Sequence, residues 1–315
     1  MSAKTTDFND GITAIDTDYV KPQLDASHLV IRDKRAAFVD TGTTHSVPAL
    51  LDALDERNIP VDYVDYVFLT HIHLDHAGGA GALMRELPNA KLVVHPRGAR
   101  HMAEPAKLEA GTRAVYGDEA FERLYGEIIP VAEERIEVVE DGDMRLLGGS
   151  PMTFLHTPGH ALHHYTIHDA DARSAFTGDT FGISYRAFDT ENGAFIFPAT
   201  TPTHFDPIQA RDSIDRILSL DIDHCFLTHY SRVSDLERLG EDLQGDLVAF
   251  TEIAKRCADE PDRTEAIRRM MRAYLGARLD EHGFPDDPAR RNEWLEMDID
   301  LNAKGLAVWL DRQEK

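Results

Sequence analysis

The chain has 315 residues, of which 42% are hydrophobic, enough for one large domain or for a domain with an extension. No stretch approaches 18 uninterrupted apolar residues, which excludes a membrane span. The net charge of −23, from 33 basic and 56 acidic residues, would repel phosphate backbones and argues against nucleic acid as a partner.

The N-terminus and the cysteines indicate the compartment. Residues 1–9 are polar and lack the apolar core of a secretion signal. Cys225 and Cys257 are too few for a disulfide framework and have no CxxC spacing. We therefore expect a cytoplasmic protein.

Apolar runs bounded by turn residues predict strands through the first 230 residues. Helical patterns lie between some of these runs, at 47–57 and at 208–220, where Asp206-Pro207 opens the helix. Strands mixed with helices indicate a layered α/β architecture. The predicted strands are 12–15, 28–31, 36–39, 66–69, 92–94, 135–139, 152–155, 165–167, 175–177 and 225–227.

The strand pattern stops near Val233. Beyond it, apolar residues recur at steps of three and four, as in amphipathic helices. We predict a catalytic domain at 1–233 and a helical extension at 234–315, which packs on that domain or on a partner subunit. A homodimer through this extension is one expectation, although no specific residue supports it. The recurring residues are Leu243, Leu247, Phe250, Ala254, Cys257, Ile267, Met270, Met271, Tyr274 and Leu275.

The most informative segment is the HIHLDH block at 71–76, directly after the predicted strand that ends at Leu69. Residues two apart on an extended segment face the same way, so His71 and His73 can bind one ion together. Asp75 and His76 lie where the chain turns and can reach a second ion. A lone histidine is more often a surface or core residue, and the chain has 16. Three histidines and an aspartate within six residues have no ordinary structural use, so the block predicts a metal site.

Further ionisable residues, His160, Asp179 and His229, each follow the end of another predicted strand. The carboxyl ends of strands in α/β sheets converge on the usual site of function, so these strand ends could gather their ligands in one cleft. The letters FLTH at 68–71 recur at 226–229. Four matching letters can arise by chance, and their common placement at strand ends is more informative.

This order of motifs resembles the metallo-β-lactamase fold superfamily, most closely its glyoxalase-II-like hydrolases, over roughly residues 10–232. The resemblance implies an αββα sandwich, which the helical extension would follow. It also implies that Asp40, in the VDTG turn, supports the metal ligands without binding the metal itself. By the same resemblance, His71, His73 and His160 hold a first metal, Asp75, His76 and His229 hold a second, and Asp179 bridges both.

The chemistry follows from this ligand set. Imidazole and carboxylate without thiolate suit zinc and also tolerate iron or manganese, and we expect two zinc ions. Two metals about 3.5–4 Å apart would share a water and present hydroxide as the nucleophile. Asp75 is the best-placed residue to orient that hydroxide or to pass a proton to the leaving group. We expect hydrolysis of a small ester, lactone or thioester, because the tail shows no basic motif for glutathione and the chain lacks the basic surface that RNA requires.

The substrate region is expected after Asp179, where Phe181, Tyr185 and His204 could line a pocket. Packing of this stretch against the helical extension explains the same aromatics equally well. An insert at 101–129 could roof the cleft.

A second class of function stays open in the same fold. Some relatives bind a di-iron centre and act on oxygen or sense it without hydrolysis. Those proteins usually carry a carboxylate at the position of His73 in this chain. They also usually carry a fused flavodoxin domain, for which residues 234–315 offer no match. A third alternative, an assembly protein with a relict site, is disfavoured because seven retained ligands without a metal would leave costly clustered charges.

Overall fold

The computed structural model describes residues 3–200 and 204–313. Its contacts divide the chain into two compact units. Unit 1 comprises Met1–His156, His163–Gly178 and Asp221–Arg232, and unit 2 comprises Thr157–Leu162, Asp179–Leu220 and Val233–Lys315. The domain boundary that the sequence predicts at residue 233 stays a prediction.

One sheet of unit 1 carries the HIHLDH block at the end of β5. Its neighbours from β1 to β4 pair antiparallel, and those from β4 to β7 pair parallel, so that the carboxyl ends of β4, β5 and β6 share one edge. The strands follow in chain order: β1 (Thr5–Asp7), β2 (Ile12–Asp16), β3 (Ala26–Arg32), β4 (Arg35–Val39), β5 (Val64–Phe68), β6 (Lys91–Val94) and β7 (Ile136–Val138).

A second sheet of unit 1 packs on the first. Its pairs are antiparallel from β8 to β11, whereas β11 and β12 are parallel. A buried cluster joins the sheets, for example where Phe68 of β5 meets Phe154 of β9 edge to face at 5.2 Å between ring centroids. The strand order is β13 (Ser231–Val233), β12 (His224–Leu227), β11 (Ser174–Gly178), β10 (Tyr165–Asp169), β9 (Ser150–His156) and β8 (Met144–Leu147).

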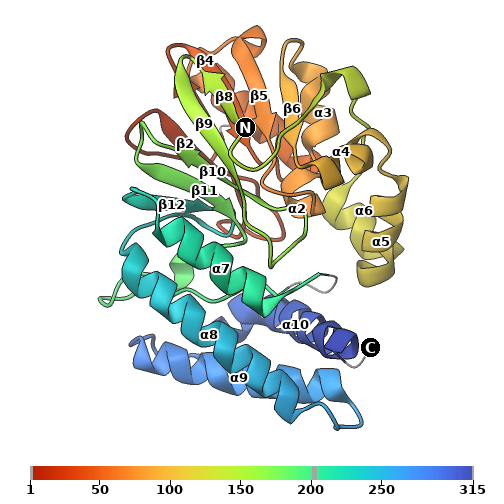
Figure 1. The fold of residues 1–315 in the computed structure, drawn as a ribbon, viewed down its shortest axis with the longest axis vertical. Helices are drawn as coiled ribbons and strands as arrows, with labels where there is room; N and C mark the ends of the chain where they lie inside the picture. The colour runs from red at the N-terminus through yellow and green to blue at the C-terminus, as the bar shows by residue number, and fades with distance from the viewer. Residues whose placement is uncertain (1–2, 201–203, 314–315) are drawn as a thin grey trace. The chain divides into compact units, whose positions relative to one another are not determined.

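Helices of unit 1 cover the other face of the first sheet. The apolar side of α1 places Leu50, Ala53 and Leu54 in a core cluster that also holds β5 and α3 residues. Figure 1 shows α3 and α4 beside β5 and β6. The helices are α1 (Val47–Glu56), α2 (Leu74–Ala77), α3 (Ala80–Glu86), α4 (Pro96–Ala103), α5 (Ala106–Tyr116) and α6 (Asp118–Tyr125), with short 3-10 turns at Thr44–Ser46, Val61–Tyr63 and Glu133–Arg135.

Unit 2 contains α7 (Pro207–Leu218), α8 (Leu236–Arg256), α9 (Arg263–Glu281) and α10 (Pro288–Gln313), with a 3-10 turn at Arg186–Phe188. Asp206 caps α7 by accepting hydrogen bonds from two backbone N–H groups of its first turn, as the sequence predicts. The three helices α8, α9 and α10 pack on one another and occupy the predicted helical tail (Figure 1). Among the described residues, no helix combines the length and apolar character needed to cross a membrane.

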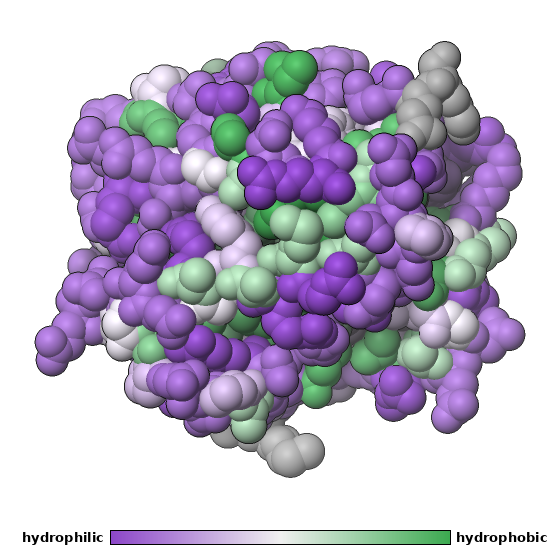
Figure 2. All heavy atoms as spheres, turned by 90° about the horizontal axis from the view of Figure 1, so that it is seen from below, coloured by the Kyte–Doolittle hydropathy of each residue, from purple (hydrophilic) through white to green (hydrophobic). Residues whose placement is uncertain are grey.

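One face of the molecule shows how polar the surface is. Hydrophilic residues predominate on the face shown in Figure 2, with smaller hydrophobic areas among them. This agrees with the 28% of charged residues in the sequence, which are mostly exposed in folded proteins.

Candidate metal centre

The HIHLDH block begins where β5 has ended and the chain is still extended. His71 Nε2 and His73 Nδ1 lie 2.9 Å apart, so the two rings face the same side, as their spacing predicts. At His73 the extended backbone gives way to α2, whose first turn carries Asp75 and His76. The ring of His76 lies 4.0 Å from that of His71 between centroids. One short segment thus brings four candidate ligands of unit 1 together.

The Asp40 carboxylate is buried at the end of β4 and holds this segment in place. It accepts hydrogen bonds from the Thr70 backbone N–H at 2.8 Å, the Thr70 hydroxyl at 2.7 Å and the Thr228 hydroxyl at 2.9 Å. Its Oδ2 also lies 2.8 Å from His76 Nδ1. A carboxylate on one ring nitrogen orients the other nitrogen for a metal, as in many histidine ligands.

Three candidate ligands of unit 1 converge in a second way. Asp75 Oδ2 lies 3.6 Å from His229 Nε2 and 3.8 Å from His76 Nε2, and one ligand atom from each of the three falls within 4.8 Å of the others. His229 Nδ1 is 3.1 Å from the Leu24 carbonyl oxygen, to which it donates. Both histidines therefore use Nδ1 on a protein acceptor and direct Nε2 toward the same carboxylate. This donor set of two imidazoles and a carboxylate fits a zinc ion.

His160 and Asp179 form a comparable pair in unit 2. His160 Nε2 lies 3.4 Å from Asp179 Oδ2, and His160 Nδ1 lies 3.2 Å from the Ala199 carbonyl oxygen. Both side chains are buried and line a cavity of about 10 Å³, room for one water molecule or ion. As in His76 and His229, Nε2 of His160 faces a carboxylate while Nδ1 donates to another protein group, here the Ala199 carbonyl.

Sequence reasoning missed three groups close to the unit 1 ligands: His164 and Asp25, which are buried, and His163, which is half-buried. The ring of His164 stacks on that of His71 at 4.8 Å, and the ring of His163 lies 5.7 Å from that of His73. Burial raises the pKa of Asp25 to about 7, with the carboxylates of Asp75 and Asp40 adding to the rise and the nearby histidines opposing it. The adjacent pair His163-His164 just after His160 was an available signal, whereas a lone aspartate before β3 offered none.

Gly178, the last residue of β11, explains why Asp179 follows a glycine. Its φ of +47° is strained for other residues, and a Cβ there would lie 2.6 Å from the Thr70 hydroxyl and 2.7 Å from His164 Nε2. Only a residue without a side chain lets β11 end this close to the HIHLDH block.

The residues predicted to line a substrate pocket lie in unit 2. Phe181 and Tyr185 are fully buried, and the Tyr185 hydroxyl donates to Asp298 Oδ2 at 2.9 Å. His204 is exposed. The burial of both aromatics favours the packing interpretation over substrate contact.

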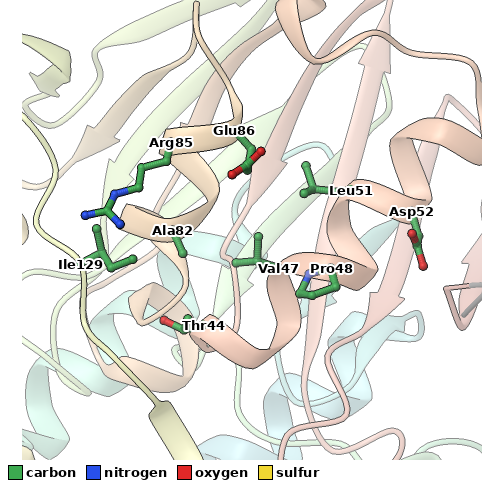
Figure 3. Close-up of a pocket in the computed structure, with 9 residues that line it drawn as sticks. All are labelled: Thr44, Val47, Pro48, Leu51, Asp52, Ala82, Arg85, Glu86 and Ile129. Carbon is green, nitrogen blue, oxygen red and sulfur yellow. The ribbon is translucent and has the colours of Figure 1, made fainter.

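A surface hollow of about 510 Å³ lies elsewhere in unit 1, between α1 and α3 (Figure 3). Its apolar floor is rimmed by the charged side chains of Asp52, Arg85 and Glu86. The lining contains none of the candidate ligands: Thr44, Val47, Pro48, Leu51, Asp52, Ala82, Arg85, Glu86 and Ile129.

Comparison with known proteins identifies the family. The model of the metallo-beta-lactamase superfamily matches residues 25–229, from just before β3 to His229. The chain belongs to the metallo-beta-lactamase superfamily. This confirms the αββα fold class and the family resemblance that the motifs indicated.

Several named proteins share 25–28% sequence identity with this chain. The metallo-beta-lactamase fold-containing protein ST1585 of Sulfurisphaera tokodaii is 28% identical over 203 residues, 63% of this chain and 70% of its own. A hydroxyacylglutathione hydrolase of Aeromonas salmonicida is 25% identical over 281 residues, 89% of this chain and 82% of its own. The human acyl-coenzyme A thioesterase MBLAC2 is 28% identical over 164 residues, 48% of this chain and 56% of its own.

A solved structure shares the fold over nearly the whole chain. The archaeal protein ST1585 from Sulfolobus tokodaii superimposes with a TM-score of 0.65 at 24% identity, covering 94% of this chain and 98% of that chain. The likeness therefore includes residues beyond the stretch that the superfamily model matches.

Proposed function

We propose that this protein is a binuclear metal-dependent hydrolase, with zinc as the resident metal. The observation that carries the proposal is the convergence of Asp75, His76 and His229, with Asp40 behind His76. Without a cation, such a buried group of imidazoles and carboxylates would be costly to keep.

The proposed ligands extend this cluster by the family's motif order. His71, His73 and His160 would hold one ion, Asp75, His76 and His229 the other, and Asp179 would bridge them. Bound zinc would supply an activated water and polarise the substrate carbonyl. The pair of His160 and Asp179, 3.4 Å apart, supports their assignment as ligands.

The remaining steps belong to side chains of the protein. Asp40 keeps His76 in the tautomer protonated at Nδ1, which leaves Nε2 as a donor atom. The Asp75 carboxylate is partly exposed, unlike the buried His76, and its oxygen that does not face the two histidines can take up a proton and pass it to the leaving group.

For the substrate we propose a small carbonyl compound, and we favour a thioester over an ester or a lactone. Two relatives carry names that place their acyl groups on glutathione and on coenzyme A, which are both thiol carriers. Because those relatives differ in the carrier, the common element is the thioester bond, and the screen should vary the carrier while keeping the acyl group constant.

The first test is the metal content of protein purified without added metal. We expect about two zinc ions per chain and no visible colour, and the loaded protein should hydrolyse at least one substrate in a thioester, ester and lactone screen. About two iron ions with an absorption that changes on reduction would instead support the di-iron redox or oxygen-sensing alternative.

Replacement of the bridging carboxylate tests the ligand assignment. Asp179→Ala should release metal and lower turnover by more than about 100-fold, because it removes a ligand common to both ions. Asp212→Ala, at an exposed position of α7, makes the same substitution away from the ligands and should change neither quantity. Full metal content and activity in Asp179→Ala would show that the bridging assignment is wrong.

A further inference from the structure

Helix α10 buries polar side chains that a mere covering helix would not need. Asp298 and Asn302 are only 6% and 2% exposed and are one turn apart, so they share a face of the helix. Burying such groups is costly unless their hydrogen bonds are made, so their partners indicate what the helix holds.

Both polar atoms of the Asn302 side chain form hydrogen bonds with residues 198–200 of unit 2. Its Oδ1 accepts from the Thr200 backbone N–H at 2.6 Å and from the Thr200 hydroxyl at 3.0 Å. Its Nδ2 donates to the Pro198 carbonyl at 3.1 Å. The amide thus binds the residues on both sides of Ala199, and it fixes the orientation of the peptide groups between them.

Ala199, between the two residues that Asn302 binds, contacts the candidate ligand His160. Its carbonyl oxygen lies 3.2 Å from His160 Nδ1 and accepts a hydrogen bond from that nitrogen. This bond places the proton on Nδ1 and leaves the lone pair on Nε2, which lies 3.4 Å from Asp179 Oδ2. The direction in which His160 offers its lone pair therefore depends on where the Ala199 carbonyl points.

The same face of α10 also contacts Tyr185, in the segment that follows Asp179. Asp298 accepts from the Tyr185 hydroxyl at 2.9 Å, and Trp294, one turn earlier, packs on the Tyr185 ring at 5.2 Å between centroids. Steps of four along α10 thus reach both Tyr185 and residues 198–200.

We propose that Asn302 is a positioning residue for the metal ligand His160, so that the C-terminal helix forms part of the support of the metal centre. This inference rests on the proposed function, in which His160 is a ligand. Asn302 itself touches neither metal nor substrate, and it acts through the Ala199 carbonyl. The helical extension then has a role in metal affinity besides covering apolar surface.

The test compares Asn302→Ala with Asn292→Ala, the same substitution at an exposed position of the same helix. Metal-free protein is titrated with Zn²⁺ against a chelator, at a temperature at which both variants are fully folded. We expect one of the two zinc equivalents to bind about 10- to 100-fold more weakly in Asn302→Ala and to be unchanged in Asn292→Ala. Wild-type affinity for both equivalents in folded Asn302→Ala would overturn the proposal.

Thr200→Val provides a milder variant if Asn302→Ala does not fold. It removes the hydroxyl bonds to Asn302 but keeps the backbone N–H bond to Oδ1, so zinc affinity should fall by a few-fold only. Unchanged zinc affinity in folded Thr200→Val would then leave Asn302 with a purely structural role and would overturn the proposal.

The tautomer of His160 gives a readout that needs no metal. In metal-free protein, nitrogen-15 NMR of histidine should show His160 protonated at Nδ1 in the wild type and a mixture of tautomers in Asn302→Ala. An unchanged tautomer would overturn the inference. Wild-type protein that binds no zinc would overturn the proposed function instead, and the tautomer would then still decide the role of Asn302.

Discussion

At the scale of single residues, Asp40 connects two parts of the chain that the sequence only hints are related. The FLTH letters at 68–71 and 226–229 place Thr70 and Thr228 one residue before His71 and His229. Both threonine hydroxyls donate to Asp40 Oδ2, so the repeated letters reflect one shared acceptor. The equivalent placement of the two histidines follows from this common attachment.

Replacement of Asp40 should therefore be severe. Asp40→Ala leaves two buried hydroxyls, a buried backbone N–H and a buried imidazole N–H without their acceptor, and we expect a loss of about 3–5 kcal/mol in the free energy of unfolding. Asp33→Ala is the matched control, because Asp33 has a positive φ like Asp40 but lies exposed in a turn. It should cost about 1 kcal/mol or less, from backbone strain alone. Urea denaturation of the metal-free proteins measures both, and equal losses would mean that strain at φ, and not the hydrogen bonds, makes Asp40 important.

The grouping of the candidate ligands at 71–76 was predictable because their spacing depends only on an extended segment that runs into a turn. His164 was not predicted, because its contact with His71 depends on the pairing of β10 with its neighbours. Asp25 was not predicted for a similar reason, since its surroundings are assembled from distant segments.

At the scale of elements, the insert of α4, α5 and α6 is tied to the segments beside the ligands. The Thr44 hydroxyl lies 2.7 Å from the Glu127 carbonyl, just after α6, and 3.2 Å from the Gly78 carbonyl at the end of α2. The Tyr125 hydroxyl, at the end of α6, lies 3.0 Å from that of Tyr19. Burial and, after it, the Asp75 carboxylate raise the pKa of Tyr19, so this hydroxyl stays neutral near the ligands.

The tyrosine pair allows a double-mutant test of this attachment. Tyr19 and Tyr125 are 5% and 2% exposed, so Tyr19→Phe or Tyr125→Phe alone leaves one buried hydroxyl and should cost about 1–2 kcal/mol of unfolding free energy. The double variant removes both hydroxyls and should be destabilised by less than the sum of the single variants. Chemical denaturation measures the four proteins, and simple additivity would indicate that the two hydroxyls do not interact.

The predicted strands correspond to β2–β7 and β9–β12, and the helical tail corresponds to α8, α9 and α10. The short strands β1, β8 and β13 were not predicted. In β8 the apolar side chains of Met144 and Leu146 are exposed, so the hydrophobic pattern does not mark a buried face.

At the scale of the whole molecule, the packing of the sheets of unit 1 encloses a histidine. His28 of β3 lies 5.5 Å from Phe176 and 5.4 Å from Phe226 between ring centroids, both on strands of the opposite sheet. Burial lowers the pKa of His28 to about 4, with the Asp40 carboxylate opposing the shift. The folded protein therefore keeps this imidazole neutral over a range in which the unfolded chain protonates it.

Acid should destabilise the protein through His28. The unfolded chain takes up a proton near pH 6.5 but the folded protein only near pH 4, so stability falls as the pH drops between these values and is unaffected above them. The loss between pH 7 and pH 5 should be about 2 kcal/mol. His28→Leu should lack this component of the pH dependence, whereas His45→Leu, at an exposed position, should keep it. Denaturation of metal-free protein at both pH values gives the comparison, and identical pH dependence in wild type and His28→Leu would contradict the prediction.

The sequence by itself determined the class of fold, the helical tail, the block of candidate metal ligands at 71–76 and the order of the candidate ligands. These features rest on local periodicity, on ligand spacing and on the ends of strands, which neighbouring residues decide. Only the tertiary structure decided that Asp40 accepts hydrogen bonds from Thr70 and from Thr228, which lies 188 residues after Asp40. It also decided that Asn302 binds the residues on both sides of Ala199, whose carbonyl lies beside His160. Such contacts depend on strand register and on the packing of a distant helix, which no local pattern encodes.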